Sequence, residues 1–324
     1  MSDNKPAALL ALDWGTSALR AWRVAADGTV LERRDRPWGI LNLPEGGYPA
    51  AFDAVTEGWR APGLPAIACG MVGSRQGWRQ VDYLALPLDL GHLAGALATV
   101  PCSAGSLHLV PGLLDPARPD VMRGEETEAV GALERLGHPG GEMLLVMPGT
   151  HCKWVRVSGG TISSFATFMT GELFALLTRH SILGQGTAPA EGAVPETPAA
   201  RDAAFRDGVR AAAADGMAGH LFSARALMLT GRLAAALVPD YLSGLLIGDE
   251  LGGALAAADR HNPERIVLVG EPALTRRYAL AFDTLGRPVP SELDAVSVRG
   301  LFRIAVAAGL VAGAVAPAAG ETAC

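Results

Sequence analysis

Two short turns of the sequence carry residues that could bind phosphate. The first, Asp13 to Ser17 (Asp-Trp-Gly-Thr-Ser), offers a carboxylate for a hydrated Mg²⁺ ion and small residues whose amides and hydroxyls can approach phosphate oxygens. The second, Gly149-Thr150, repeats this small turn in the second half of the chain. Either turn alone could be an ordinary hairpin turn, because these residue types favour turns. Their recurrence at matching positions predicts a site that holds one polyphosphate from two sides.

Several familiar catalytic motifs are absent from the sequence. The only lysine besides Lys5 is Lys153, which follows Cys152 and not a glycine-rich loop, so no GxxxxGK[ST] loop exists. No GxGxxG follows an expected strand, and HExxH, GxSxG and paired CxxC motifs are also missing. These absences exclude P-loop enzymes, zincins, hydrolases with the usual nucleophile elbow and structural zinc sites.

The hydrophobic pattern predicts two similar α/β halves that would position these turns. The first half has strands at 8–12, 17–24 and 29–34, then a helix at 50–60, a strand at 65–69, a helix at 92–99, a strand at 107–110 and a helix at 124–136. The second half has strands at 143–147, 151–157 and 161–165, helices at 171–182, 203–221 and 240–259, a strand at 265–269, and helices at 274–285 and from 295 onward. We expect domains at 1–137 and 138–324, with the last helix free to pack back at the interface and 184–200 as a surface excursion.

Composition excludes several classes of partner. The 27 basic and 33 acidic residues give a net charge of −6 without a basic stripe, so we expect no nucleic acid partner. The longest apolar stretch, 304–320, is interrupted by Gly and Pro and is too short to cross a bilayer, so we expect no membrane association. The 4 cysteines form no disulfide pattern and no signal peptide is evident, which favours the cytoplasm.

Five strings of the sequence carry a family resemblance: Asp13-Trp-Gly-Thr16, Gly73-Ser-Arg-Gln-Gly77, Met122-Arg-Gly-Glu-Glu-Thr127, Met147-Pro-Gly-Thr-His-Cys-Lys-Trp154 and Met169-Thr-Gly-Glu-Leu173. Over about residues 8 to 310 the chain resembles the 2-dehydro-3-deoxygalactonokinase family, within the actin-like ATPase and sugar-kinase superfamily. The resemblance implies an α/β protein of two ribonuclease-H-like domains, with the active site in the cleft between them. It also implies that the protein binds ATP and Mg²⁺. The implied reaction is phosphorylation of the terminal hydroxyl of 2-dehydro-3-deoxy-D-galactonate, a step of galactonate catabolism.

The resemblance also implies which residues bind ATP. The superfamily's first phosphate motif falls on Asp13 to Ser17, its second on Gly149-Thr150, and its adenosine motif on 269–272, where a single glycine replaces the usual pair. The residues assigned to ATP are Asp13, Gly15, Thr16, Ser17, Gly149, Thr150, Gly270 and Glu271. Asp13 is also the candidate magnesium ligand.

The general base is implied at the start of a helix, where the superfamily usually has Asp and this chain has Glu125 and Glu126. A carboxylate at a helix N-terminus is held ionised and can accept the proton of a substrate hydroxyl during phosphoryl transfer. The alternative is that either glutamate only stabilises the first turn of its helix. Glu125, directly after Gly124, matches the superfamily spacing better.

The implied substrate is an acid sugar, so a cationic side chain should meet its carboxylate. The candidates are Arg75, Gln76, Arg123, Arg20 and Lys153. Arg75 and Arg123 are the best placed, although an arginine in this arginine-rich chain could equally be a solvated surface residue. Trp38, Trp78 and Trp154 could line the sugar, but burial in the core is the more common role of tryptophan. Glu172 could lie in the cleft or simply begin a helix. His151 and Cys152 are adjacent on a strand and would make a poor metal pair.

Rival functions remain open at this point. The nearest is a kinase of another small acid sugar on the same fold. A non-catalytic sugar-sensing regulator would normally carry a DNA-binding helix-turn-helix before the first strand, where only about seven residues precede it. An actin-like assembling ATPase is a third class. A homodimer is a candidate assembly, and the sequence does not determine the oligomeric state.

Overall fold

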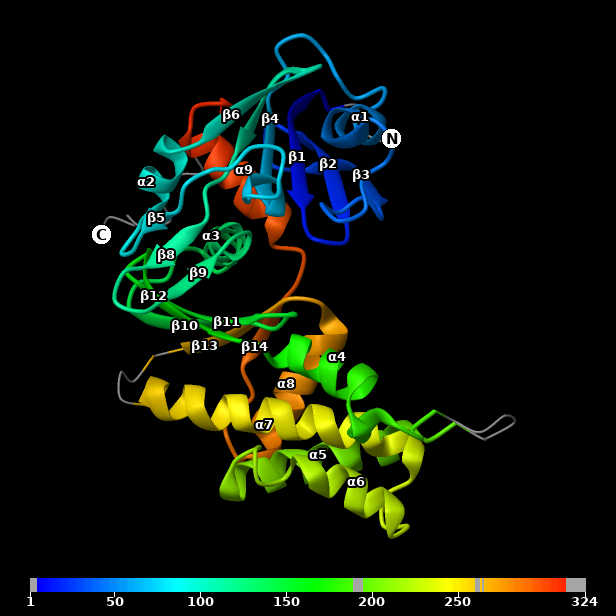
Figure 1. Ribbon diagram of the computed structural model, residues 1–324. Helices are drawn as coiled ribbons and strands as arrows, with labels where there is room; N and C mark the ends of the chain where they lie inside the picture. The colour runs from blue at the N-terminus through cyan, green and yellow to red at the C-terminus, as the bar shows by residue number, and fades with distance from the viewer. Residues whose placement is uncertain (1–4, 189–194, 260–262, 264, 313–324) are drawn as a thin grey trace. The chain divides into compact units, whose positions relative to one another are not determined.

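The computed structural model describes residues 5–188, 195–259, 263 and 265–312. The chain divides into two compact units (Figure 1). The first comprises Met1–Pro139, Gly160–Ile162 and Ala295–Cys324, and the second comprises Gly140–Gly159 and Ser163–Asp294. The first unit is therefore built from three separate segments of the chain.

The first unit is organised around a six-stranded sheet in the order β3-β2-β1-β4-β7-β6 (Figure 1). Its strands are β1 (Ala7–Trp14), β2 (Leu19–Ala25), β3 (Val30–Arg36), β4 (Ala66–Gly70), β6 (Ala98–Cys102) and β7 (Gly105–Leu109). β1, β2 and β3 pair antiparallel, whereas β4 runs parallel to both β1 and β7. The three-strand meander predicted from the sequence is confirmed.

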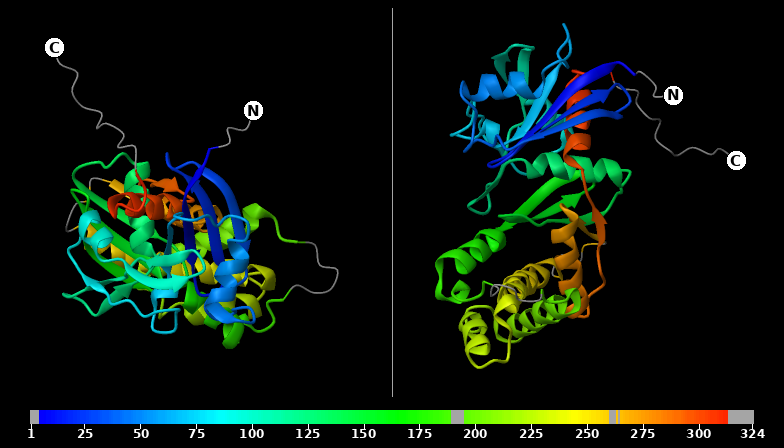
Figure 2. Two further views of the ribbon diagram at one scale, coloured as in Figure 1. Left: turned by 90° about the horizontal axis from the view of Figure 1, so that it is seen from above. Right: turned by 90° about the vertical axis from the view of Figure 1, so that its right-hand side faces the viewer.

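Alternation along β1 decides which residues reach each face of this sheet. Leu10, Leu12 and Trp14 pack in one hydrophobic cluster with Phe52 of α1 (Gly47–Val55). The intervening residues, Asp13 among them, point to the opposite face. There α9 (Ser297–Ala307) contacts β1 and β4, as Figure 2 shows for the red helix beside the blue strands. Asp13 is thus separated from the α1 core.

The rest of the first unit differs in part from the sequence-based expectation. The helix expected at 92–99 is α2 (Leu90–Gly95), and its predicted end belongs to β6, which pairs antiparallel with β7. A small sheet of β5 (Leu84–Ala85), β8 (Leu113–Asp115) and β9 (Asp120–Met122) was not predicted, because strands of two or three residues are too short to show alternation. The helix expected at 124–136 is α3 (Glu125–Arg135), which packs against α9.

The second unit repeats the arrangement with a sheet in the order β12-β11-β10-β13-β14. Its strands are β10 (Glu142–Met147), β11 (Cys152–Ser158), β12 (Thr161–Phe168), β13 (Arg265–Val269) and β14 (Ser291–Leu293). β10 and β11 pair antiparallel, and β13 runs parallel to β10 and to β14. The repeated meander is confirmed, and β14 was missed because it has only 3 residues.

The helices of the second unit are α4 (Thr170–His180), α5 (Pro198–Asp215), α6 (Leu221–Leu229), α7 (Val238–Asp259) and α8 (Pro272–Thr284). α5, α7 and α8 cover one face of the sheet, whereas α4 and α6 pack on α7. Leu144 and Trp154 of the sheet pack with Phe205 of α5, Ile247 of α7 and Phe282 of α8, and Figure 1 shows α5 and α7 side by side.

Two helix predictions in this part of the chain were wrong at their ends. The single helix expected at 203–221 ends at Asp215, because Gly216 takes a positive φ of 80°, and α6 follows as a separate helix. The helix expected from 295 onward is α9 (Ser297–Ala307) of the first unit, which ends within the apolar stretch 304–320; residues 313–320 lie outside the described residues, as do 189–194 of the predicted excursion. In the described part of the chain, no helix combines the length and apolar character needed to cross a membrane.

Candidate active site

Asp13 lies at the end of β1, where β4 is its parallel neighbour and Cys69 its direct partner in register. Oδ2 of Asp13 is 3.1 Å from Nη1 of Arg20, and Oδ1 is 4.0 Å from Sγ of Cys69. Burial raises the pKa of the Asp13 carboxyl, and the Arg20 guanidinium opposes this rise. The side chain still keeps 16% of its surface exposed, so the carboxylate can be reached by a ligand.

The N-terminus of α3 lies against the end of β4. Gly124, the residue before the helix, has a φ of 111°, which favours glycine, and a side chain there would lie 3.5 Å from Cα of Gly70. Glu126 is fully buried; its carboxylate accepts a hydrogen bond from the Gly124 amide at 2.6 Å and another from Oγ1 of Thr127 at 3.0 Å. Burial, helped by the nearby Glu125, raises the pKa of Glu126 to about 7.

Glu125 differs from its neighbour in being partly exposed. Its Oε2 accepts a hydrogen bond from the Arg123 amide at 3.0 Å, which folds the side chain back over the start of the helix. A carboxylate must be reachable to take a proton from a bound molecule. Glu125 meets this requirement and Glu126, with no exposed surface, does not.

Glu128 adds a further carboxyl to the same end of α3. Burial raises the pKa of Glu128 to about 8, with the charges of Asp13 and Glu125 adding to the rise, while Oγ of Ser297 donates a hydrogen bond to it at 3.2 Å. The charges of Asp13, Glu125 and Glu126 each contribute to the raised pKa of Glu128, and the Arg20 guanidinium opposes the rise at Asp13. A cation bound here would stabilise the ionised forms of these carboxyls.

The structure separates the candidate arginines. Arg75 is exposed in the loop after the short helix η1 (Met71–Gly73), and the carbonyl of Gln76 accepts a hydrogen bond from the Tyr48 hydroxyl at 2.7 Å. Arg123 instead donates from Nη2 to the Val81 carbonyl at 2.7 Å, and its Nε and Nη1 are buried. Of these two guanidinium groups, the one on Arg75 is accessible.

The two candidate turns of the second unit lie at neighbouring strand ends. β10 ends at Met147 just before Gly149-Thr150, and its parallel neighbour β13 ends at Val269 just before Gly270. A side chain at Gly270 would lie 3.6 Å from the Pro148 carbonyl oxygen. Because parallel strands bring their carboxyl ends to one edge of the sheet, the phosphate turn and the adenosine loop are adjacent within this unit.

The start of α4 packs against the Gly149-Thr150 turn. A side chain at Gly171 would collide with the Gly149 carbonyl and with Cα of Thr150, so only glycine fits there. The Glu172 amide donates to the Thr150 carbonyl at 3.0 Å, and Oε2 of Glu172 lies 2.5 Å from Nε2 of His151. Two sequence strings that the resemblance singled out separately therefore form one local structure, which sequence reasoning missed because the paired side chains are 21 residues apart.

The buried carboxylate of Glu250 also holds the start of α4 in place, through the hydroxyl of Thr170. Glu250 of α7 accepts hydrogen bonds from Nε1 of Trp154 at 2.7 Å, from the Tyr278 hydroxyl at 2.7 Å and from the Thr170 hydroxyl. Burial raises the pKa of Glu250. Trp154 is thus a core residue in this structure, and no sequence signal distinguished Glu250 from other helix glutamates.

Lys153 lies on β11 and is 5% exposed, with Nζ donating to Oγ1 of Thr167 at 2.8 Å. Among the described residues, no group of three or more His, Cys, Asp or Glu side chains is arranged to hold a metal ion. Any metal ion bound at Asp13 would thus depend largely on water and substrate oxygens for its coordination.

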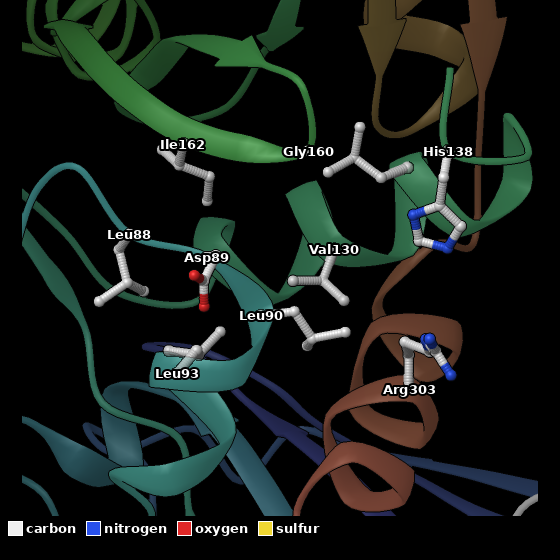
Figure 3. A pocket seen from close by; sticks show the side chains of 10 residues that line it. Leu88, Asp89, Leu90, Leu93, Val130, His138, Gly160, Ile162 and Arg303 are labelled. Carbon is white, nitrogen blue, oxygen red and sulfur yellow. The ribbon is translucent and has the colours of Figure 1, made fainter. Parts of the chain in front are cut away.

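A separate cavity of about 200 Å³ lies within the first unit (Figure 3). Apolar side chains form most of its wall, including Leu93, Val130 and Ile162, and the charged side chains of Asp89 and Arg303 also line it. None of the candidate residues for ATP, metal or sugar lines this cavity.

Comparison with known proteins shows that the sequence of this chain is similar to those of sugar-acid kinases. A family model described as 2-keto-3-deoxy-galactonokinase matches residues 13–304. The chain is 38% identical over 282 residues, 86% of its length and 90% of the relative's, to 2-dehydro-3-deoxygalactonokinase of Escherichia coli (strain K12). It is 41% identical over 281 residues, 85% of its length and 89% of the relative's, to a Rhizobium meliloti (strain 1021) protein assigned the same activity.

Solved structures agree with these relatives. A crystal structure of a Sinorhizobium meliloti protein assigned as 2-dehydro-3-deoxygalactonokinase aligns with a TM-score of 0.80 and 38% identity, over 93% of this chain and 98% of that one. Component A of (R)-2-hydroxyglutaryl-CoA dehydratase from Acidaminococcus fermentans aligns with a TM-score of 0.50 and 12% identity, over 94% and 98% of the two chains, and so shares the fold alone. The α/β fold of the actin-like ATPases, predicted from the sequence, is confirmed.

Proposed function

The chain belongs to the 2-keto-3-deoxy-galactonokinase family, and from that membership we propose how its residues share the work of the reaction. It is an ATP-dependent sugar-acid kinase. The terminal hydroxyl of 2-dehydro-3-deoxy-D-galactonate attacks the γ-phosphorus of ATP, giving the 6-phosphate and ADP, in galactonate catabolism. The observation that carries the assignment of residues is the partly exposed Glu125 at the start of α3, directly after Gly124, which lies against Gly70 at the end of the strand beside β1.

Glu125 is the proposed general base. Its carboxylate accepts the proton of the substrate's terminal hydroxyl as that oxygen forms a bond to the γ-phosphorus and the bond to the ADP oxygen breaks. The hydrogen bond from the Arg123 amide fixes the side chain in place. Glu126 has a different role: it satisfies the Gly124 amide, and so holds the turn that presents Glu125.

Mg²⁺ fits the end of β1. Burial raises the pKa of the Asp13 carboxyl because it disfavours the charged form, and a dication there would stabilise that charge. Asp13 would hold the ion, which when bound neutralises phosphate charge during transfer. The Arg20 guanidinium keeps the carboxylate oriented on the neighbouring strand.

The phosphates and the adenosine of ATP are assigned to the turns described above. In the first unit these are Gly15, Thr16 and Ser17 after β1, whose amides and hydroxyls can donate to phosphate oxygens. In the second unit they are Gly149-Thr150 for phosphate and Gly270-Glu271 for adenosine, at the ends of adjacent parallel strands. Positioning by backbone amides suits phosphoryl transfer, in which the protein mainly orients and stabilises charge.

Arg75 is the proposed partner of the sugar-acid carboxylate. Its guanidinium is exposed on a loop held by Gln76 and Tyr48, whereas that of Arg123 is turned towards the Val81 carbonyl. An arginine can bind a carboxylate through two parallel hydrogen bonds, which gives specificity for an acid over a neutral sugar.

We place the enzyme in the cytoplasm, where ATP is available.

A coupled ADP-release assay tests the proposed activity. The panel contains 2-dehydro-3-deoxy-D-galactonate, its stereoisomers, simple aldonates and neutral sugars, each with Mg²⁺ and ATP. We expect the highest kcat/KM for 2-dehydro-3-deoxy-D-galactonate. A higher value for another acid sugar would reassign the substrate within the same reaction, and ADP release from none of the panel would overturn the proposal.

A further inference from the structure

A histidine and a glutamate that the mechanism above does not use form a pair beside the second phosphate turn. Nε2 of His151 lies 2.5 Å from Oε2 of Glu172, and the two side chains are 46% and 39% exposed. His151 directly follows Thr150 in the chain. The pair is therefore both next to the turn and accessible from solvent.

Backbone contacts fix the position of this pair. The Glu172 amide donates to the Thr150 carbonyl at 3.0 Å, and Gly171 lies so close to the turn that no side chain fits. The first turn of α4 is thus held against Gly149-Thr150, and the Glu172 carboxylate comes from that first turn. His151 is anchored at one end by the chain and at the other by the carboxylate.

The chemistry left available at this place suits a phosphate anion. Because Glu172 occupies Nε2, the ring meets a ligand with Nδ1, which has no hydrogen-bond partner among the described residues. In the protonated ring Nδ1 is an N–H donor. The 11-residue helix α4 also directs the positive end of its dipole towards the turn. The His151 ring and the start of α4 therefore both lie beside Gly149-Thr150.

We propose that His151, oriented by Glu172, is a phosphate-binding residue that contacts the terminal phosphates of ATP at the Gly149-Thr150 turn. The ligand class is a nucleoside di- or triphosphate, and Glu172 is a positioning residue that acts through the ring. This inference rests on the proposed assignment of Gly149-Thr150 to phosphate and adds a side chain to it. The loss of one charge-assisted hydrogen bond predicts roughly 10–100-fold weaker binding.

The test uses His151→Asn and isothermal titration of the full-length protein with MgATP, MgADP and AMP. We expect affinity for MgATP and MgADP to fall roughly 10–100-fold, while affinity for AMP stays within about twofold of wild type. The KM for the sugar acid should not change. Wild-type affinity for MgATP, or an equal loss for AMP, would overturn the inference.

A matched control exists elsewhere in the chain. His138 and Glu134 form a similar pair, with Nε2 and Oε2 2.7 Å apart and side chains 46% and 38% exposed, in the first unit. His138 has a φ of 50°, a conformation that asparagine tolerates, so His138→Asn is a fair counterpart. It should leave nucleotide affinity unchanged, and a loss equal to that of His151→Asn would mean that the effect is not specific to the turn.

Glu172→Gln tests the positioning role. If Glu172 acts through the ring, MgATP affinity falls in this variant but not further in the double variant with His151→Asn, because the two side chains work as one unit. Glu172→Asp, which keeps the charge, should restore part of the affinity. Losses that simply add, with no recovery in Glu172→Asp, would show that Glu172 does not act through His151.

Thr150→Val separates failure of this inference from failure of the underlying site. If Thr150→Val weakens MgATP binding and His151→Asn does not, the turn binds phosphate without the histidine, and the inference alone is wrong. If neither substitution changes MgATP binding, the assignment of the turn to phosphate is itself wrong. Circular dichroism and melting temperature within about 2 °C of wild type confirm that each variant is folded.

Discussion

Arg20 and Asp13 are direct partners across the antiparallel strands β1 and β2, and Nη1 of Arg20 lies 3.1 Å from Oδ2 of Asp13. The guanidinium satisfies one carboxylate oxygen of a residue whose charge burial disfavours. Arg20, which the sequence analysis includes among the candidate sugar ligands, contacts Asp13 in the structure. This contact orients the Asp13 carboxylate, and the binding of Mg²⁺ is a separate function that we propose for the same group.

Asp13→Asn should leave the protein folded and nearly inactive. The amide keeps the shape of the side chain and removes the charge that would hold Mg²⁺, so we expect kcat to fall by at least about 10²-fold. Steady-state kinetics at saturating MgATP measure the change, with the melting temperature as the folding control. Turnover within a few-fold of wild type would remove Asp13 from the mechanism.

Glu125→Gln and Glu126→Gln should affect different quantities. Loss of a positioned base predicts a fall in kcat of roughly 10²–10⁴ for Glu125→Gln with little change in ATP affinity. Glu126→Gln should be milder in kcat, because that side chain is fully buried and bonded to the Gly124 amide. The reverse order of effects would move the base by one residue, and two mild effects would mean that orientation of the substrate dominates.

The stability of the protein should fall as pH rises from about 5 to 9. The pKa of Glu128 is raised to about 8 in the folded protein and lies near 4.5 when the chain is unfolded, so the folded state binds more protons between these values and loses stability as they dissociate. Glu128→Gln should match the wild-type melting temperature near pH 5 and exceed it near pH 9. Exposed Glu57→Gln is the control, and a parallel pH dependence in wild type and Glu128→Gln would contradict the assignment.

Arg75→Gln should lower activity selectively towards acid substrates. Removing a charge-assisted contact predicts roughly 10–150-fold lower kcat/KM for the sugar acid, with ATP affinity and weak activity towards a neutral deoxy-sugar retained. Arg118, also exposed in the first unit, provides the control Arg118→Gln. Equal losses on charged and neutral substrates would defeat the carboxylate contact and direct attention to backbone amides.

The repeated meander was predictable from sequence because each strand is long enough to show its pattern. In β1, for example, Leu10 and Leu12 alternate with residues that face α9, and the turn after Asp13 contains Gly15. By contrast β5, with only two residues, takes its conformation from pairing with β8, and such pairing leaves no local signal.

The candidate site was only partly predictable for a similar reason. Spacing after Gly124 pointed to both Glu125 and Glu126, but only the folded structure distinguishes the buried carboxylate from the accessible one. Likewise His151 and Glu172 are far apart in the sequence, and their contact depends on α4 packing against a turn. Sequence motifs identify candidate residues, whereas the burial and the contacts of each side chain in the folded structure determine which of them a substrate can reach.

The first unit contains both the beginning of the chain and α9 near its end. During synthesis, the ribosome releases β1 and β4 long before it releases α9, the helix that contacts both strands. The sheet face that carries Asp13 therefore cannot be covered by α9 until residues 297–307 have been synthesised. All strands of the second sheet are synthesised before that point. A fragment that stops at Pro139 lacks this covering helix and should aggregate unless α9 is supplied as a separate peptide.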